Sequence, residues 1–332
     1  MDDPLAVLDQ AARDRTRPAA GHGWREPLLA TLTSERFSDP DWLYERKLDG
    51  VRALASRDDG APKVWSRNHR DVSASYPEIV AALAACGGPR FVADGEIVAF
   101  DHGQTSFARL QARIHLTDPE RIRRTGVAVF YYLFDLLAYD GVDLTGLPLR
   151  DRKRVLRQAF RFSDPLRFST HRHAEGEAYY REACARGWEG LIAKRASSTY
   201  KGGRSRDWLK FKCVNEQEFV IGGFTPPQGS RAGFGALLVG YYEGRRLRYA
   251  GKVGTGYDNR TLRRLRERMG VLEQPESPFG EPVRERGAHW VRPELVAQIG
   301  FTEWTADRKL RHPRFLGLRE DKPADEVVRE VG

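Results

Sequence analysis

The sequence predicts an α+β protein of two domains, the second of which is a small β-barrel. From about residue 27 to about residue 213, short β-rich runs alternate with helical stretches. After about residue 215 the pattern changes to glycine-punctuated strands with little helix, which is typical of a small closed barrel. We therefore expect a loosely structured lead-in over 1–25, a first domain over 26–215 and a second domain over 216–332.

Strands of the first domain are expected where β-branched, aromatic and other apolar residues run together. These runs are 42–45, 51–56, 63–65, 91–100, 129–137, 190–195 and 208–213. The run 129–137 is almost continuously apolar, as a buried central strand would be. Helices are expected at 76–86, 151–159 and 175–186. The last of these ends at Gly187, because glycine readily adopts the left-handed conformation that follows many helices.

The second domain is expected to contain strands at 219–224, 236–242 and 247–253 and one basic helix at 259–269. No internal repeat is visible. The whole chain of 332 residues has a formal net charge of +9, and its surplus of positive charge is rich in arginine. This balance favours an anionic partner, above all nucleic acid. The alternative is an arginine-rich surface that serves only solubility.

Cysteine usage and the apolar runs indicate a cytoplasmic protein with no membrane partner. Cys86, Cys184 and Cys213 are widely spaced, so neither a disulfide framework nor a four-cysteine zinc site is expected, and a reducing compartment fits. The N-terminus is acidic and has no apolar signal core. The longest apolar run, 127–139, is too short to span a membrane and contains Asp135.

The most informative motif is the hexapeptide 47–52, which reads Lys-Leu-Asp-Gly-Val-Arg. A lysine amine ordinarily has a pKa near ~10.4, so a nucleophilic Lys47 needs nearby cations or a metal to lower that pKa. Gly50 allows the chain to turn tightly against a ligand. The alternative is a solvated charged turn over 45–49, and other segments must decide between the two interpretations.

The strand 208–213 carries two lysines on one face. Alternation places Trp208, Lys210 and Lys212 together, with Leu209, Phe211 and Cys213 on the opposite face. Two same-face ammonium groups repel each other on a bare strand but are favourable opposite a phosphate chain. The alternative is an edge strand that uses lysine to prevent aggregation.

Several acids and one aromatic residue lie in or beside the apolar strands. Asp94 and Glu96 share a face of the strand 91–100; Glu96 could bind a ribose hydroxyl or a metal, whereas Asp94 is expected to be structural. Phe134 could offer a flat ring to a base, although most such residues are core. Glu189 opens the segment 189–194, and a carboxylate there could bind Mg²⁺ beside a phosphate.

In this order, these segments resemble the covalent nucleotidyltransferases, and specifically the ATP-dependent DNA ligases. The resemblance extends from about residue 27 to the C-terminus. It rests on 45–52, 66–68, 94–96, 132–135, 189–194, 208–212, 310–315 and 319–322. The late segments, with 290–293 and 300–305, are most similar to the ligase module of bacterial end-joining ligases that work with Ku. The resemblance implies a nucleotidyltransferase (ATP-grasp-like adenylation) domain of antiparallel sheets with helices, followed by a C-terminal OB-fold β-barrel.

The resemblance also implies roles for individual residues. Lys47 would attack the α-phosphate of ATP and retain AMP as a phosphoramidate. Mg²⁺ or Mn²⁺ would lie beside Glu189, with Glu96 as a second metal-side carboxylate. The other expected nucleotide contacts are Glu45 at the adenine edge, Arg52 and Glu96 at the ribose, Phe134 at the base, Lys210 and Lys212 at the phosphates, and Arg67 at a nucleotide or DNA phosphate. Ile192 is a further expected nucleotide-binding residue.

The OB-fold domain is expected to take part in the first step. Arg319, Asp321 and Lys322 would come over the nucleotide and orient the pyrophosphate leaving group. The domain would then swing away and present a basic face to DNA, as such barrels commonly bind nucleic acid. The alternative for 319–322 is an ordinary mixed-charge loop.

The expected function is sealing of 5′-phosphate/3′-hydroxyl nicks or breaks in duplex DNA, in repair by end joining. An RNA ligase or a capping-type enzyme would share the lysine motif but differ in nucleotide choice, and a non-catalytic DNA-binding module would form no AMP adduct. An NAD-dependent ligase is disfavoured because only 46 residues precede Lys47. Expected partners are DNA, Ku and separate end-processing polymerase and nuclease proteins, with the chain itself a monomer associated with the nucleoid.

Overall fold

The computed structural model describes residues 3–86, 89–213, 215–227 and 233–330, so the first two residues of the expected lead-in lie outside it. The chain divides into two compact units, one reaching to Cys213 and the other following it. Each unit has its own hydrophobic core. Among the residues that the structure describes, no helix is both long enough and apolar enough to cross a membrane.

The larger sheet of the first unit has the strand order β1-β9-β8-β6-β4-β5. These strands are β1 (Arg17–Pro18), β9 (Val142–Asp143), β8 (Val129–Tyr139), β6 (Phe91–Asp101), β4 (Val51–Arg57) and β5 (Lys63–Ser66). Two short strands extend the path: β7 (Gln104–Thr105) pairs with β6, and β10 (Leu166–Phe168) runs parallel to β8. The remaining pairings are antiparallel, and β8 is the interior strand that its apolar run predicts.

The smaller sheet has the order β11-β3-β12-β13-β2. Its strands are β11 (His171–His173), β3 (Trp42–Arg46), β12 (Gly190–Arg195), β13 (Gly203–Lys212) and β2 (Leu28–Leu32). Only the β13–β2 pairing is parallel. Strand β13 begins at Gly203 rather than at Trp208, because residues 203–205 pair with β2 before a register shift.

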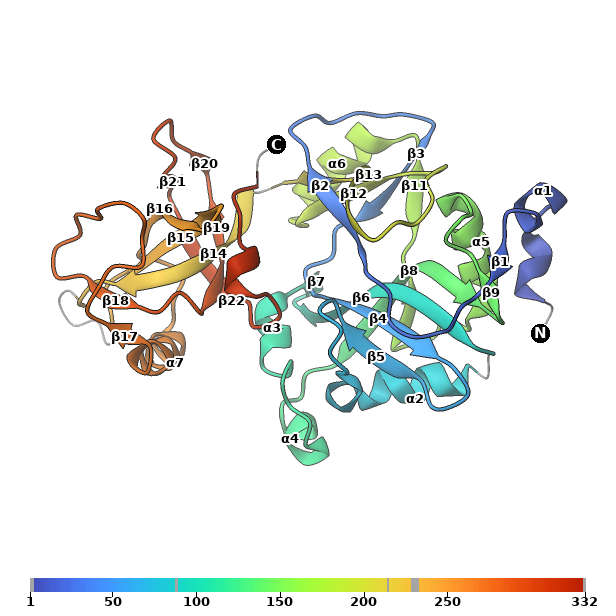
Figure 1. Ribbon diagram of the computed structural model, residues 1–332, viewed down its shortest axis with the longest axis horizontal. Coiled ribbons are helices and arrows are strands. Elements are labelled where there is room, and N and C mark those ends of the chain that lie inside the picture. Colours follow the sequence, from blue (N-terminus) through green and yellow to red (C-terminus); the bar gives the residue numbers. More distant parts are fainter. Residues whose placement is uncertain (1–2, 87–88, 214, 228–232, 331–332) are drawn as a thin grey trace. The chain divides into compact units, whose positions relative to one another are not determined.

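The two sheets of the first unit pack face to face, with helices on their outer surfaces (Figure 1). Leu43 and Trp208 of the smaller sheet meet Leu54 and Phe134 of the larger sheet in one buried cluster. Helix α6 (Gly176–Ala185) covers β12 and β3, and α5 (Leu149–Ala159) covers β8. The remaining helical segments of this unit are α2 (Pro77–Ala85), α3 (Phe107–Gln111), α4 (Pro119–Arg124) and η2 (Ser73–Ser75).

The lead-in is more ordered than the sequence indicates. It forms η1 (Pro4–Val7), α1 (Gln10–Arg13) and strand β1, which pairs with β9. The Asp9 side chain caps α1 by accepting a 2.8 Å hydrogen bond from the Ala12 N–H. Leu8 and Ala12 are buried in the core of the first unit. Their four-residue spacing was the only sequence pattern that indicated a short helix here.

A disulfide joins Cys184 and Cys213, contrary to the expectation that the cysteines are unpaired. The two residues are 29 positions apart in sequence, but β13 returns along β12 and ends beside α6. Tertiary structure therefore creates a proximity that spacing alone does not reveal. Cys86 is a free cysteine in the first unit.

The second unit is the small barrel that the glycine-punctuated strands predict, with the OB fold that the family resemblance implies. Its main sheet runs β16-β15-β14-β18-β17, and β19 pairs with both β14 and β22. Helix α7 (Asn259–Gly270) packs Leu262, Leu265 and Met269 onto the barrel core. The other elements are β14 (Asn215–Phe224), β15 (Leu237–Glu243), β16 (Arg246–Val253), β17 (Glu273–Gln274), β18 (His289–Val291), β19 (Val296–Phe301), β20 (Glu303–Trp304), β21 (Leu310–Arg311), β22 (Arg314–Leu318) and η3 (Ala324–Glu326).

Candidate active site

Lys47 lies directly after β3 and forms an ion pair with Glu189, which precedes β12. The backbone N–H of Lys47 donates a 2.9 Å hydrogen bond to the carbonyl of Gly190, so the neighbouring strands hold the lysine backbone next to the carboxylate. The two side chains are largely buried, with 18% and 9% of their surface exposed. The fold thus brings together two predicted site residues that are 142 positions apart in sequence.

Two glycines near Lys47 and Glu189 in the sequence allow close backbone contacts. A Cβ atom at Gly50 would lie 2.2 Å from the carbonyl oxygen of Ile97. Gly190 has a φ of +144°, and a Cβ there would lie 1.9 Å from the carbonyl oxygen of Phe211. Any side chain at either position would collide with backbone, which explains why glycine stands at the fourth position of the lysine motif and directly after Glu189.

Three predicted nucleotide-binding residues lie in one row across the smaller sheet. Ile192 of β12 is directly opposite Glu45 of β3 on one side and Lys210 of β13 on the other. Directly opposite residues project from the same face of a sheet, so an acid, an apolar side chain and a lysine share one surface. Such a row can accept hydrogen bonds, contact an apolar ring and bind an anion in that order.

A second row crosses the larger sheet, where Arg52 of β4 is opposite Glu96 of β6 and Glu96 is opposite Tyr132 of β8. The Arg52 guanidinium makes two 2.6 Å hydrogen bonds to Asp94, which also accepts a 2.6 Å bond from the Tyr200 hydroxyl. Burial opposes the charge of Arg52, but the contact with Asp94 raises its pKa above the ordinary value. Asp94 is fully buried, so it is held in one place and its two hydrogen bonds fix the orientation of the Arg52 guanidinium.

Glu45 is held by three groups that sequence reasoning missed. Lys153 Nζ lies 2.6 Å from Glu45 Oε1, while Lys194 Nζ and Ser169 Oγ each lie 2.9 Å from Oε2. Burial alone would raise the pKa of Glu45, but the two lysines together hold it at about 2. The alternation within 190–195, which places Lys194 on the same face as Ile192, was the one available signal.

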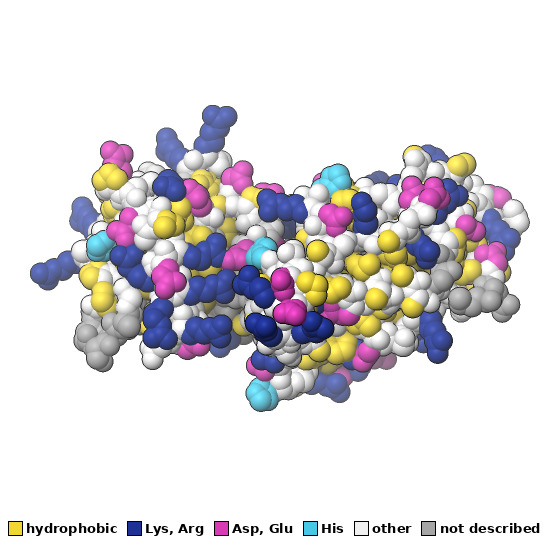
Figure 2. Space-filling model, turned by 90° about the horizontal axis from the view of Figure 1, so that it is seen from below, with side chains coloured by type: hydrophobic (Ala, Val, Ile, Leu, Met, Phe, Trp, Pro, Cys, Tyr) yellow, Lys and Arg dark blue, Asp and Glu magenta, His cyan; other side chains and the backbone are white. Residues whose placement is uncertain are grey.

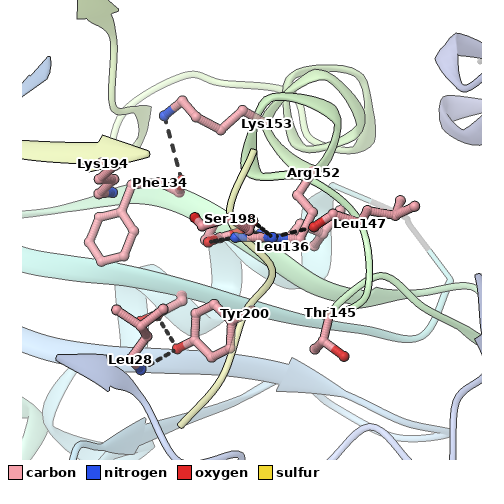
Figure 3. Close-up of polar contacts among 12 residues, drawn as sticks. Leu28, Phe134, Leu136, Thr145, Leu147, Arg152, Lys153, Lys194, Ser198 and Tyr200 are labelled. Atoms are coloured by element: carbon pink, nitrogen blue, oxygen red, sulfur yellow. Dashed lines mark hydrogen bonds and ion pairs between the residues drawn. The ribbon is translucent and has the colours of Figure 1, made fainter. Parts of the chain in front are cut away.

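Phe134 lies in the inter-sheet core with cations against its ring. Lys194 Nζ is 4.0 Å from the ring centroid, and the Arg52 Cζ atom is 4.5 Å from it. Figure 3 shows Lys153 reaching the Phe134 backbone from helix α5, while Lys194 approaches from strand β12. Burial lowers the pKa of Lys194 to about 8, although Glu45 opposes that shift. The ring is thus fixed in place by both sheets.

Strand β13 shows the alternation expected of it. Trp208 lies in the inter-sheet cluster, whereas Leu209 and Phe211 pack in a separate cluster under α6. Lys212 ends the strand directly opposite Gly190, beside Glu189. Arg67, the remaining predicted site residue of this unit, lies in the turn that follows β5.

The predicted motif residues of the OB fold form local ion pairs within the second unit. Arg319 makes two hydrogen bonds to Asp321, at 3.0 and 2.8 Å, and Lys322 Nζ lies 3.0 Å from Glu218 Oε2. Glu320 forms ion pairs with Arg264 and Arg268 of α7. Figure 2 shows Lys and Arg side chains gathered over this helix, whose arginines are Arg260, Arg263, Arg264, Arg266 and Arg268.

The donor set suits a nucleotide better than an all-protein metal cage. Among the described residues, no group of three or more His, Cys, Asp or Glu side chains is placed to hold a metal ion. Mg²⁺ commonly binds one or two carboxylates and completes its shell with water and substrate phosphates. Glu189 and Glu96 are the predicted carboxylates for such a site, and a bound phosphate chain would complete its ligand shell. An adenine amino group, in turn, is a suitable donor to the Glu45 carboxylate.

A sheet that pairs a lysine with a carboxylate, packed against a larger sheet and followed in the chain by an OB fold, is the arrangement of a covalent nucleotidyltransferase. The model of the ATP dependent DNA ligase domain matches residues 27–212, and that of the ATP dependent DNA ligase C terminal region matches residues 230–322. The chain therefore belongs to the ATP-dependent DNA ligase family.

Relatives and a solved structure agree with this assignment. The chain is 40% identical over 316 residues to the multifunctional non-homologous end joining protein LigD of Pseudomonas aeruginosa, and 38% identical over 313 residues to LigD of Mycobacterium tuberculosis. The match covers 92% of this chain but only 37% and 40% of those relatives. The structure of mycobacterial DNA ligase D complexed with ATP and MES is 36% identical, with a TM-score of 0.67 over 92% of this chain and 98% of that one.

Proposed function

We propose that this chain is an ATP-dependent DNA ligase that seals 5′-phosphate/3′-hydroxyl nicks and breaks in duplex DNA. One observation carries the proposal: Lys47 is paired with Glu189 beside the row of Glu45, Ile192 and Lys210. That arrangement supplies a nucleophile, a base-recognition edge and a phosphate-binding cation on adjacent strands. The similarity to LigD and to the ATP-bound ligase structure supports it.

In the proposed first step, the Lys47 ammonium releases a proton to solvent, leaves its hydrogen bond to Glu189 and attacks the α-phosphorus of ATP as a neutral amine. The nitrogen loses a second proton to solvent as the new bond forms. A nitrogen–phosphorus bond forms, the bond to the β-phosphate oxygen breaks, and pyrophosphate leaves. Lys210 and Lys212 offset the charge on the phosphates. Glu189 and Glu96 would hold Mg²⁺ or Mn²⁺, which supplies further charge neutralisation when bound.

We assign the base and ribose contacts to the two residue rows. Glu45 accepts a hydrogen bond from the adenine amino group, and Phe134 and Ile192 contact the base. Arg52 and Glu96 bind the ribose hydroxyls, and Arg67 binds a nucleotide or DNA phosphate. In the OB fold, Arg319, Asp321 and Lys322 orient the pyrophosphate. The family resemblance supports these assignments, and the strand register, which pairs Glu45 with Ile192 and Arg52 with Glu96, is consistent with the base and ribose contacts.

In the later steps, the adenylate passes from Lys47 to a 5′-phosphate of DNA, and the 3′-hydroxyl then displaces AMP to close the backbone. In-line geometry and charge neutralisation matter more here than acid–base side chains, which suits a site rich in lysine, arginine and carboxylates.

We propose that the substrate arises in end joining, that the chain acts as a cytoplasmic, nucleoid-associated monomer, and that Ku and separate polymerase and nuclease proteins are its partners. The match to LigD supports this placement.

Intact-mass measurement tests the proposal directly. The protein is incubated with Mg²⁺ or Mn²⁺ and with ATP, GTP or NAD in parallel, and nicked duplex DNA or nicked RNA is then added to separate samples. We expect an AMP adduct with ATP alone, discharged by the nick as sealed DNA forms. An adduct with GTP would identify a capping-type enzyme, and adduct transfer to RNA alone would identify an RNA ligase. No adduct with any nucleotide would reject the enzyme assignment.

A further inference from the structure

The Cys184–Cys213 disulfide joins helix α6 to the residue that follows strand β13. The Cα atoms of the two residues are 5.2 Å apart. Both residues are half-buried, so neither is fully enclosed in the core. Oxidants or thiols in solution could therefore form or break the bond between α6 and the end of β13.

The segment closed by this bond carries much of the nucleotide site. The site residues it contains are Glu189, Ile192, Lys210 and Lys212. Beside the sulfur, the Cys213 N–H donates a 3.0 Å hydrogen bond to the carbonyl of Glu189. One turn earlier in α6 than Cys184, the Tyr180 hydroxyl donates a 2.9 Å hydrogen bond to the carbonyl of Lys212. Helix α6 thus holds the end of β13 by one covalent bond and one hydrogen bond.

The position of the bond matters because the ladder between β12 and β13 ends there. The last pair in the register is Gly190 with Lys212. Strand ends fray because they are fixed from one side only, and a crosslink at the next residue opposes that fraying. Of the lysines proposed to bind the phosphates, Lys212 is nearest to the disulfide in the chain. The position of Lys212 therefore depends most on that bond.

We propose that Cys184 and Cys213 form a reversible thiol–disulfide modification site that sets the rate of nucleotide attachment to Lys47. This inference rests on the proposed function for the role of Lys212. The disulfide form holds Lys212 in place for the phosphates. In the dithiol form, the end of β13 is held by hydrogen bonds alone, and nucleotide attachment is slower.

The chemistry requires a two-electron oxidant, and a low-molecular-weight disulfide is sufficient. One cysteine thiolate attacks that disulfide, forms a mixed disulfide and releases one small thiol. The second cysteine thiolate then attacks the protein sulfur of the mixed disulfide and releases the other small thiol. Both protein thiols lose their protons, the protein is oxidised by two electrons, and the small disulfide is reduced to two thiols. An excess of small thiol reverses both steps.

The test compares oxidised and reduced wild-type protein, so it needs no destabilising variant. The protein is equilibrated with oxidised or reduced glutathione, freed of it, and its bond state is read by differential alkylation and intact mass. The rate of AMP attachment to Lys47 is then measured at limiting ATP. We expect the oxidised form to react at least about fivefold faster, which corresponds to about 1 kcal/mol, and reduction followed by reoxidation to restore the rate.

Two variants separate the bond from other thiol chemistry. Cys184→Ser should react at the slower rate in both buffers, because it cannot form the bond. Cys86→Ser should follow the wild type, because Cys86 lies near the end of α2 and is not part of the disulfide. Cys213→Ala provides a second test should Cys184→Ser fold poorly.

The outcomes distinguish this inference from the proposed function. Failure of the two cysteines to form the bond in the oxidising buffer, or equal rates of AMP attachment in the two forms, would overturn the redox control alone. Absence of an AMP adduct in both forms would overturn the proposed function, even though alkylation would still report the state of the bond.

Discussion

Lys153 Nζ lies 2.6 Å from Glu45 Oε1, and each of these side chains is only 2% exposed. Lys153 belongs to helix α5 and Glu45 to strand β3, so this contact ties the outer helix of the larger sheet to the strand that ends directly before Lys47. Lys153 Nζ also donates a 3.0 Å hydrogen bond to the carbonyl of Ser169, whose hydroxyl binds the same carboxylate. Glu45 is thus positioned by a network that no linear motif contains.

We predict that Lys153→Met destabilises the protein by about 3 kcal/mol, because it leaves a buried carboxylate without one of its two cationic partners. Urea unfolding, followed by fluorescence, measures the change in the free energy of unfolding. Lys63→Met is the matched control, because Lys63 is 57% exposed and lies 3.9 Å from Asp71. That variant should change stability by less than about 0.5 kcal/mol. A similar small effect for Lys153→Met would show that the buried contact contributes little.

His171 offers a direct report on the charge of Lys153. Strand β11 places His171 opposite Glu45. Although the residue keeps an exposed surface, partial desolvation of its ring, followed by the nearby Lys153 charge, lowers the pKa of the imidazole to about 4. Removing that charge in Lys153→Met should raise the His171 pKa. An NMR titration of the imidazole measures it in both proteins. An unchanged pKa would mean that Lys153 does not act on this side of the sheet.

Glu45 should make the free energy of unfolding depend on pH in the acidic range. Its pKa is about 2 in the folded protein, below the ordinary value of 4.5, so the stability it contributes is present above about pH 4.5 and is lost as the pH falls toward about 2. Between about pH 5 and about pH 3 the loss should be about 2 kcal/mol. Chemical denaturation at several pH values measures it. Glu45→Gln should lack this part of the slope; an identical slope in both proteins would remove Glu45 as its source.

Local patterns predicted most of the fold because each strand and helix carries its own periodicity. The apolar run 129–137 became the interior strand β8, and the basic helix near 259–269 became α7. Groups that meet only through tertiary packing were missed. Lys153 reaches Glu45 across 108 positions, and the disulfide closes only because β13 ends beside α6. The short lead-in helix also lacked enough turns to show a clear period.

The ion pair between Lys47 and Glu189 leads to a prediction for chemistry. Lys47→Ala should abolish the AMP adduct completely, because no other group replaces the attacking amine. Its affinity for nicked duplex DNA should fall by less than about threefold, since many phosphate contacts share the binding energy. Intact mass and fluorescence anisotropy measure the two properties. Lys201→Ala removes an exposed lysine of the same unit and should form the adduct normally. Adduct formation by Lys47→Ala would place the nucleophile elsewhere.

The OB-fold motif leads to a prediction that separates the reaction steps. Arg319 and Asp321 bind each other in two hydrogen bonds, so Arg319→Ala should free the carboxylate and remove a cation proposed to orient pyrophosphate. We expect AMP attachment to Lys47 to slow by about 100-fold, as for loss of one charge-stabilising donor. Pyrophosphate does not take part in the later steps, so sealing of DNA that already carries a 5′-adenylate should change by less than about threefold.

Arg292→Ala is the matched control, because Arg292 is an exposed arginine of the same unit that pairs only with its neighbour Glu294 among the contacts described. It should leave both rates near those of the wild type. Quenched-flow measurement with labelled ATP gives the first rate, and gel analysis of a pre-adenylated nick gives the second. An equal loss in both assays for Arg319→Ala would mean that Arg319 supports DNA binding or the fold of the barrel instead of the departure of pyrophosphate.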